Sequence, residues 1–247
     1  MTTPYRSRGL ARPWSRRCAP PLNRPVVRTK GHQVIPFETY VDDFFALVAR
    51  GVVEIYNEFS LQHELGIHFR TLLAPHHRVQ FERPVGFFSL TPAPGIKKEI
   101  DIAVFSTDRT DRVAIELKFP RNGQYPEQMF SACQDIAFLE ELVRSGFSAG
   151  LFVMAADDPL FYGGPGRDGI YAHFRAERAI HGVISKPTGA KDRSVTIAGT
   201  YKVSWRAGGP VRYTNHGHEE WRRLTTRCGG LGGETHCLVQ TSVAAGR

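Results

Sequence analysis

Two short, mostly apolar segments separated by a polar connection constrain the fold of this chain more than any other feature. Glu99–Phe105 reads E-I-D-I-A-V-F, Arg112–Phe119 reads R-V-A-I-E-L-K-F, and S-T-D-R-T-D joins them. Branched and aromatic residues bounded by turn-forming residues are typical of β-strands. The pattern therefore predicts a β-hairpin that brings Asp101 beside polar residues of the second strand.

The segments around the hairpin predict further helices and strands. Val79–Val85 also has an extended pattern, and a turn at T-P-A-P-G, residues 91–95, separates it from the hairpin. A helix over Tyr125–Arg144, closed by Gly146, and a buried strand at Ala149–Ala155 follow. We therefore expect an α/β fold, with the order α-β-β-β-α-β and a mixed sheet flanked by helices.

Two helices are expected before the sheet, a short one ending at Gly51 and a longer one from Val52 to Leu73. Apolar residues that recur every three or four positions predict one buried stripe on the longer helix. These residues are Val52, Ile55, Tyr56, Phe59, Gly66, Phe69 and Leu73.

Beyond the sheet, the sequence predicts a glycine-rich loop at Gly163–Gly169, a helix over Ile170–His181 and one or two strands within Ser194–Arg206. The expected domain covers residues 34–206. Residues 207–247 are rich in Gly, His and Arg, and we expect this tail to be poorly ordered.

Residues 1–33 contain eight basic residues and no acidic residue, which accounts for the whole formal net charge of +8. This composition predicts a disordered basic arm. It also resembles a mitochondrial transit peptide, and a misassigned start codon explains it equally well. Because the rest of the chain is formally neutral, affinity for nucleic acid has to come from a local patch or from the arm.

The sequence predicts a soluble, cytoplasmic protein. No apolar run reaches the roughly 18 residues that a membrane helix needs, and the N-terminus lacks the apolar core of a secretory signal. The four cysteines, Cys18, Cys133, Cys228 and Cys237, form no CxxC pair, which favours reduced thiols.

Asp101, Glu116 and Lys118 carry the chemistry that the hairpin predicts. Glu116 and Lys118 share one face of a strand, and Asp101 is expected on the neighbouring strand. Two carboxylates can share a Mg²⁺ ion, which holds a phosphate oxygen and lowers the pKa of a bound water. Lys118 can then orient that water or help to deprotonate it, and offset the negative charge on the phosphate.

This arrangement, with the order of elements over roughly residues 52–155, resembles the PD-(D/E)xK nuclease superfamily, which has a restriction-endonuclease-like core. The resemblance implies a nuclease that depends on Mg²⁺ or Mn²⁺ and acts on nucleic acid, with DNA as the expected substrate. It implies that Asp101 and Glu116 bind the metal and that Lys118 is catalytic. The chain departs from the literal motif at Ile100, where the motif has proline.

Two further correspondences follow from this resemblance. Members often place a helical glutamate before the sheet as an additional metal or water ligand, which implies Glu64 first and Glu58 second. Some members also carry a QxxxY signature after the lysine. Gln134 to Phe138 has that spacing, with phenylalanine in place of tyrosine, so Gln134 is expected to face the site.

Lys97, Lys98 and Arg121 are the predicted phosphate contacts. The expected partner is nucleic acid, with no membrane, and a homodimer is possible. The sequence leaves open DNA versus RNA, sequence preference and endonuclease versus exonuclease action.

Several alternatives compete with an active nuclease. Glu116 and Lys118 could be a solvated charge pair on a strand surface, or the chain could be an inactive nuclease fold that binds DNA. A Schiff-base role for Lys118 is disfavoured because Glu116 would keep the amine protonated. The G-G-P-G loop at 163–166 lacks the GK[ST] ending of a phosphate-binding loop. A zinc site is not expected either. The spacing of the candidate ligands matches no closed structural zinc site; these candidates are His216, His218, Cys228, His236 and Cys237.

Overall fold

The computed structural model describes residues 35–90, 99–121, 123–165, 168–176, 178–189, 193–210 and 220–228, without the side chains of 207–210 and 220–222. Its contacts divide the chain into Met1–Ile35 and Pro36–Arg247. The predicted arm at 1–33 and the predicted turn at 91–95 lie outside the described residues. Within the described ranges, no helix has the length and apolar character needed to cross a membrane.

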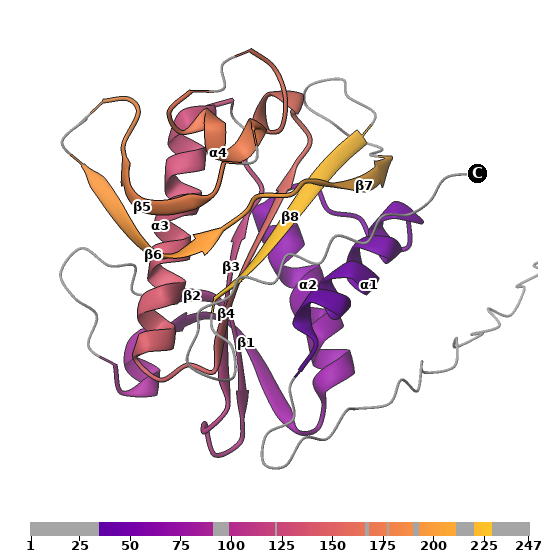
Figure 1. The fold of residues 1–247 in the computed structure, drawn as a ribbon. Coiled ribbons are helices and arrows are strands. Elements are labelled where there is room, and N and C mark those ends of the chain that lie inside the picture. Colours follow the sequence, from indigo (N-terminus) through magenta and orange to yellow (C-terminus); the bar gives the residue numbers. More distant parts are fainter. Residues whose placement is uncertain are drawn as a thin grey trace, which may run out of the picture. The chain divides into compact units, whose positions relative to one another are not determined.

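A mixed sheet of six strands forms the centre of the second unit, in the order β1-β2-β3-β4-β8-β7 (Figure 1). β3 and β4 are parallel, and every other neighbouring pair is antiparallel. The predicted hairpin is formed by β2 and β3. The bounds are β1 His77–Pro84, β2 Glu99–Ser106, β3 Arg112–Lys118, β4 Ala149–Ala156, β7 Arg206–Pro210 and β8 Glu220–Cys228.

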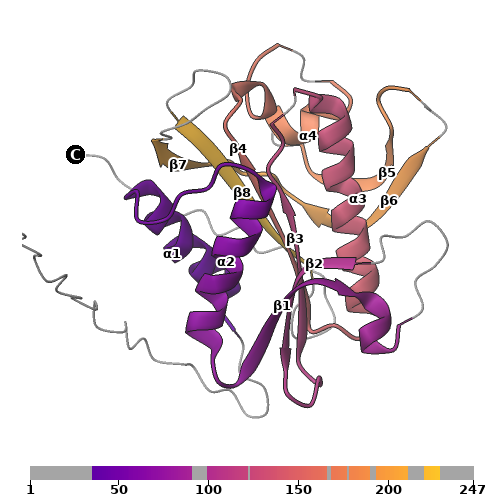
Figure 2. The ribbon, with the colours of Figure 1, turned by 180° about the vertical axis from the view of Figure 1, so that it is seen from behind.

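Helices cover both faces of this sheet, which confirms the predicted α/β architecture. α1 and α2 lie on one face and α3 on the other (Figures 1 and 2). A separate two-stranded sheet, β5 and β6, packs against α3. The bounds are α1 Phe37–Ala49, α2 Glu58–Leu73, α3 Tyr125–Arg144, α4 Tyr171–Arg175, β5 Ile180–Ser185 and β6 Ser194–Tyr201, with 3-10 turns at Val85–Phe88 and Pro159–Phe161.

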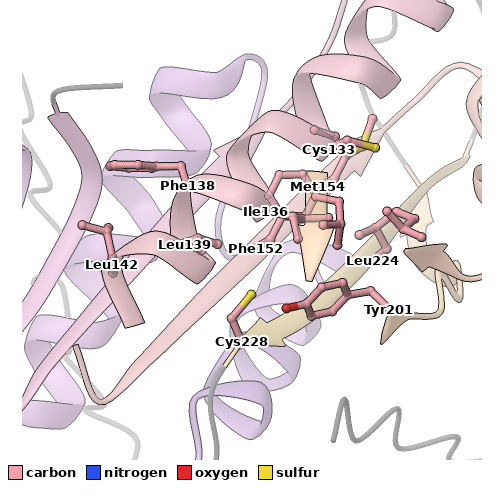
Figure 3. Close-up of a cluster of buried hydrophobic side chains, with 14 of the residues drawn as sticks. Cys133, Ile136, Phe138, Leu139, Leu142, Phe152, Met154, Tyr201, Leu224 and Cys228 are labelled. Atoms are coloured by element: carbon pink, nitrogen blue, oxygen red, sulfur yellow. The ribbon is translucent and has the colours of Figure 1, made fainter. Parts of the chain in front are cut away.

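The core beneath α3 joins the large sheet to the small one. Apolar side chains from α3, β4, β6 and β8 meet there (Figure 3). The buried carboxylate of Glu140 accepts hydrogen bonds from Ala198 N at 2.9 Å, Gly199 N at 2.7 Å and Tyr201 Oη at 2.8 Å. These bonds fasten β6 to α3, which also packs against β3, the strand that carries Lys118.

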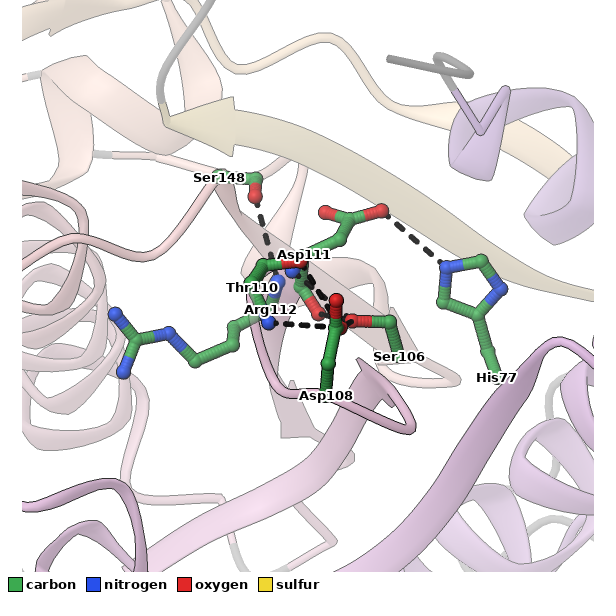
Figure 4. Close-up of polar contacts among 7 residues, drawn as sticks. All are labelled: His77, Ser106, Asp108, Thr110, Asp111, Arg112 and Ser148. Atoms are coloured by element: carbon green, nitrogen blue, oxygen red, sulfur yellow. Dashed lines mark hydrogen bonds and ion pairs between the residues drawn. The ribbon is translucent and has the colours of Figure 1, made fainter. Parts of the chain in front are cut away.

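The connection between β2 and β3 is a turn built on Asp108. Its Oδ1 accepts hydrogen bonds from Ser106 Oγ at 2.5 Å, Thr110 N at 3.2 Å and Thr110 Oγ1 at 2.9 Å (Figure 4). These bonds, that from Ser106 foremost, lower the pKa of Asp108. His77 Nε2 and Asp111 Oδ2 lie 3.2 Å apart, which links the turn to β1. The turn sets the hairpin register that the site depends on.

The start of the longer helix differs from the prediction. α2 begins at Glu58 rather than Val52, because the Asn57 side chain accepts a hydrogen bond from Ser60 N and caps the helix. Ile55, Phe69 and Leu73 are buried as expected, together with Gly66. Val52, Tyr56 and Phe59 are instead 68%, 59% and 72% exposed, so their assignment to the buried stripe is wrong.

The C-terminal part also differs from the prediction. α4 covers only Tyr171–Arg175, and Ile180 and Ile184 belong to β5, where pairing with β6 outweighs helical periodicity. The prediction that the chain is poorly ordered beyond residue 206 is wrong for Glu220–Cys228, because β8 pairs with β4 along seven residue pairs. Residues 211–219 and 229–247 lie outside the described residues.

Candidate functional site

Asp101 lies where strand pairing is interrupted on both sides. The β1–β2 register skips the pair of Glu82 and Asp101, and Glu82 has a positive φ of 47°. The β2–β3 register ends at Ile102 and Ile115, one residue before Asp101 is reached. A local irregularity of this kind redirects side chains and leaves backbone groups to be satisfied by other partners.

Side chains take the place of strand partners around Asp101. Its Oδ2 accepts a hydrogen bond from Leu117 N at 2.8 Å, and its own N–H donates to Glu116 Oε1 at 3.3 Å. Its carbonyl accepts a hydrogen bond from Gln62 Nε2 at 2.8 Å. Asp101 is 8% exposed and Glu116 is fully buried. The structure thus brings together the two acids that the sequence predicts as metal ligands.

Lys118 lies beside these acids and is held by a third. Its Nζ is 2.9 Å from Asp135 Oδ2, on the buried side of α3. Burial lowers the pKa of Lys118, but the carboxylates of Asp135, Glu58 and Asp101 outweigh it and raise that pKa. The amine is therefore protonated at neutral pH. In this arrangement it can donate hydrogen bonds and supply positive charge.

Glu58, rather than Glu64, is the helical glutamate at the site. It is the first residue of α2, and its Oε2 accepts a hydrogen bond from Phe119 N at 2.8 Å. Gln62, one turn later, shares this helix face. At about 100° per residue, Glu64 is turned by about 200° from Gln62 and lies on another face of α2. Of the two predicted glutamates, the second choice, Glu58, is the one that the structure brings to the strand of Lys118.

Sequence reasoning missed Gln62 and Asp135. The signal for Gln62 is its spacing of four residues from Glu58, which is visible in the sequence. On α3 the predicted residue, Gln134, is half-buried, and its neighbour Asp135 is the one that reaches Lys118. Phe138, which replaces the tyrosine of the signature, is a buried core residue.

Arg121 is engaged with protein groups. Its Nε is 3.1 Å from Oδ2 of Asp157, a fully buried residue just beyond β4, and its Nη1 donates to the carbonyl of Tyr56 at 2.7 Å. Arg121 thus links three segments of the protein, and its contact with phosphate stays a prediction. The other predicted phosphate contacts, Lys97 and Lys98, lie outside the described residues.

The oxygen donors at the site fit a hard divalent cation. Among the residues that the structure describes, no group of three or more His, Cys, Asp or Glu side chains is placed to hold a metal. Mg²⁺, however, is commonly bound through one or two carboxylates while it keeps several waters. Asp101 and Glu116 are the two carboxylate residues of the site that were predicted as its ligands.

Of the candidate zinc ligands, the structure describes Cys228, which is buried, and the other four members of that set lie outside the described residues. Comparisons of the chain with protein-family models, curated proteins and solved structures find no significant match.

Proposed function

We propose that this chain is a nuclease with a restriction-endonuclease-like core that uses Mg²⁺ or Mn²⁺ to hydrolyse phosphodiester bonds of nucleic acid, with DNA as the expected substrate. The observation that carries the proposal is the approach of Asp101 and Glu116 in the gap between β2 and β3, beside Lys118, whose amine pairs with Asp135. The element order from α2 to β4 supports it.

In this proposal, Asp101 and Glu116 hold the cation. When bound, a divalent cation polarises a phosphate oxygen and lowers the pKa of a coordinated water. Lys118 places a fixed positive charge where negative charge builds up on the phosphate during attack. Asp135 and Glu58 keep the Lys118 amine charged and in position. Gln62 fixes the backbone of Asp101 through its carbonyl.

A second candidate is an inactive nuclease fold that binds nucleic acid. One observation favours it: the Lys118 amine is already paired with Asp135, so its charge is partly neutralised. The two candidates predict the same binding partner but differ in whether the partner is cut.

Cleavage of labelled single-stranded and duplex DNA by the full chain in Mg²⁺ tests the proposal. Asp101→Asn and Glu116→Gln keep side-chain shape and remove the charge that holds the cation. Each is expected to lower the rate on the order of a hundredfold or more, since each 1.36 kcal/mol of lost transition-state stabilisation lowers the rate tenfold. Glu141→Gln is the matched control, because Glu141 forms an exposed ion pair with Arg144 on α3.

Cleavage is expected in Mn²⁺ as well, and to fail in Ca²⁺ and in excess EDTA. A Glu116→Gln protein that cuts at the parental rate, or undiminished cleavage in EDTA, would remove the proposal. Binding of DNA by the parent without any cleavage would establish the inactive alternative.

A further inference from the structure

Exposed aromatic side chains flank the carboxylate at the start of α2. Tyr56 is 59% exposed and Phe59 is 72% exposed. Between them in the sequence, Glu58 binds Phe119 N, next to Lys118. Rings of this size are usually buried, because leaving one in water forgoes a large hydrophobic gain. Both rings therefore belong to the same short segment as Glu58, whose side chain reaches the site.

The outer face of α2 continues these rings away from the site. His63 is exposed one helical turn beyond Phe59. The His63 ring centroid is 5.2 Å from that of Phe81 on β1, and the guanidinium carbon of Arg70 is 5.6 Å from the Phe81 centroid. Tyr56, Phe59, His63, Phe81 and Arg70 together are called the aromatic row below.

The far end of the row is held in place by the backbone. Phe81 lies directly against α2 because residue 66 is glycine: a Cβ there would be 2.1 Å from Phe81 Cε1. Arg70 Nη2 donates to the carbonyl of Val79 at 3.2 Å. The ring and the guanidinium plane are therefore positioned before any ligand arrives, which lowers the entropic cost of binding one.

We propose that the aromatic row binds the unpaired bases of a single-stranded nucleic acid whose backbone passes Asp101 and Glu116. Unpaired bases stack on aromatic rings and on arginine planes, whereas the bases of a duplex have their faces covered. The guanidinium of Arg70 also supplies positive charge that attracts the phosphates of a nucleic acid. The inference rests on the proposed function and adds the substrate class: single strands, or single-stranded segments, rather than intact duplex.

Binding is measured separately from cleavage, by fluorescence anisotropy of the full chain carrying Glu116→Gln. The probes are labelled oligothymidine of about 15 nucleotides and a duplex of equal length, at about 0.2 M salt. Phe59→Leu and Phe81→Leu keep apolar bulk and remove the π-face. Each is expected to weaken single-strand binding about tenfold, the factor that corresponds to the loss of one stacked base.

Val183→Ala is the matched control, because Val183 is a 67% exposed apolar residue on β5, which packs against α3 and not α2. The Val183→Ala protein is expected to bind the single strand with the affinity of the parent. The basic N-terminal segment is present in every protein compared, so its contribution cancels.

Parental affinity in Phe59→Leu, or tighter binding of the duplex than of the single strand, would overturn the inference. The inference would also be overturned if Phe59→Leu differed from the parent only in its mass by sedimentation. The aromatic row would then be a contact with a second copy of this chain. Failure of the proposed function has a different signature: single-strand binding that depends on Phe59, without cleavage by the parent in Mg²⁺.

Discussion

Gln62 shows how a single buried amide positions a carboxylate on another element. Its Nε2 donates to Glu82 Oε1 at 2.5 Å and to the Asp101 carbonyl at 2.8 Å, and the residue is 5% exposed. The positive φ of Glu82 places its carboxylate within reach of this amide. The amide therefore replaces the strand partner that Asp101 lacks on the β1 side.

We predict that Gln62→Leu lowers the free energy of unfolding by about 1–3 kcal/mol, because it removes a buried amide donor from the Asp101 carbonyl. It should also lower kcat of DNA cleavage more than it changes KM, because it displaces Asp101 rather than a group that binds substrate. Urea unfolding and steady-state kinetics check both effects. Parental stability would mean that water replaces the amide.

Lys118 makes the stability of the protein sensitive to alkaline pH. Its pKa is raised above the ordinary value of 10.5 in the folded state, whereas the unfolded chain has the ordinary value. A group with a raised folded-state pKa contributes stability that is fully present below the unfolded value and is lost as pH rises through the folded value.

We therefore compare the free energy of unfolding of the parent with that of Lys118→Met. The difference, parent minus variant, is expected to be constant from pH 7 to roughly pH 10 and to fall at higher pH. Urea titrations of both proteins at several pH values measure this difference, and other titrating groups cancel in it. A difference that rises with pH would contradict the ion pair with Asp135.

At the scale of elements, the start of α2 determines which glutamate reaches the site. Asn57 Oδ1 accepts a hydrogen bond from Ser60 N at 2.8 Å, and Ser60 Oγ accepts from Asn57 N at 3.0 Å and from Tyr56 N at 2.7 Å. This reciprocal cap ends the preceding loop and makes Glu58 the first helical residue.

Asn57→Ala is expected to lower the free energy of unfolding by about 1 kcal/mol, the usual cost of losing a helix N-cap. It should also speed amide hydrogen exchange in the first turn of α2 and reduce the rate of cleavage, because Glu58 lies in that turn. Asn57→Asp is expected to keep the parental exchange and cleavage rates. Hydrogen exchange followed by mass spectrometry locates the effect. Faster exchange spread evenly over the protein would point to global rather than local opening.

At the scale of the whole molecule, the formal net charge and the candidate site belong to different parts of the chain. Deleting residues 1–33 removes the entire excess of +8 and none of the residues at the candidate site. We expect the deletion to leave cleavage chemistry intact and to weaken nonspecific affinity for nucleic acid. For each duplex phosphate that the shortened chain no longer binds, the slope of log affinity against log salt should fall by roughly 0.9.

Titrations of the full and shortened chains at two salt concentrations compare the slopes. Equal slopes would show that this segment binds no phosphate.

Local patterns in the sequence were sufficient for the hairpin, the α/β order and the convergence of Asp101 with Glu116. Strand alternation and turn residues act over a few positions, so they can be recognised without knowing what packs against them. The same reasoning failed at Val52, Tyr56 and Phe59, where a helical repeat of apolar residues did not correspond to burial.

The remaining site residues depend on contacts between distant parts of the chain. Gln62 bonds to Asp101, 39 positions later in the sequence, and Glu58 bonds to Phe119, 61 positions later. Asp135 on α3 pairs with Lys118 on β3. β8 likewise becomes a strand by pairing with β4, more than 60 residues earlier. A helix face or a strand edge acquires its role only when a partner is placed against it, and no local pattern specifies that partner.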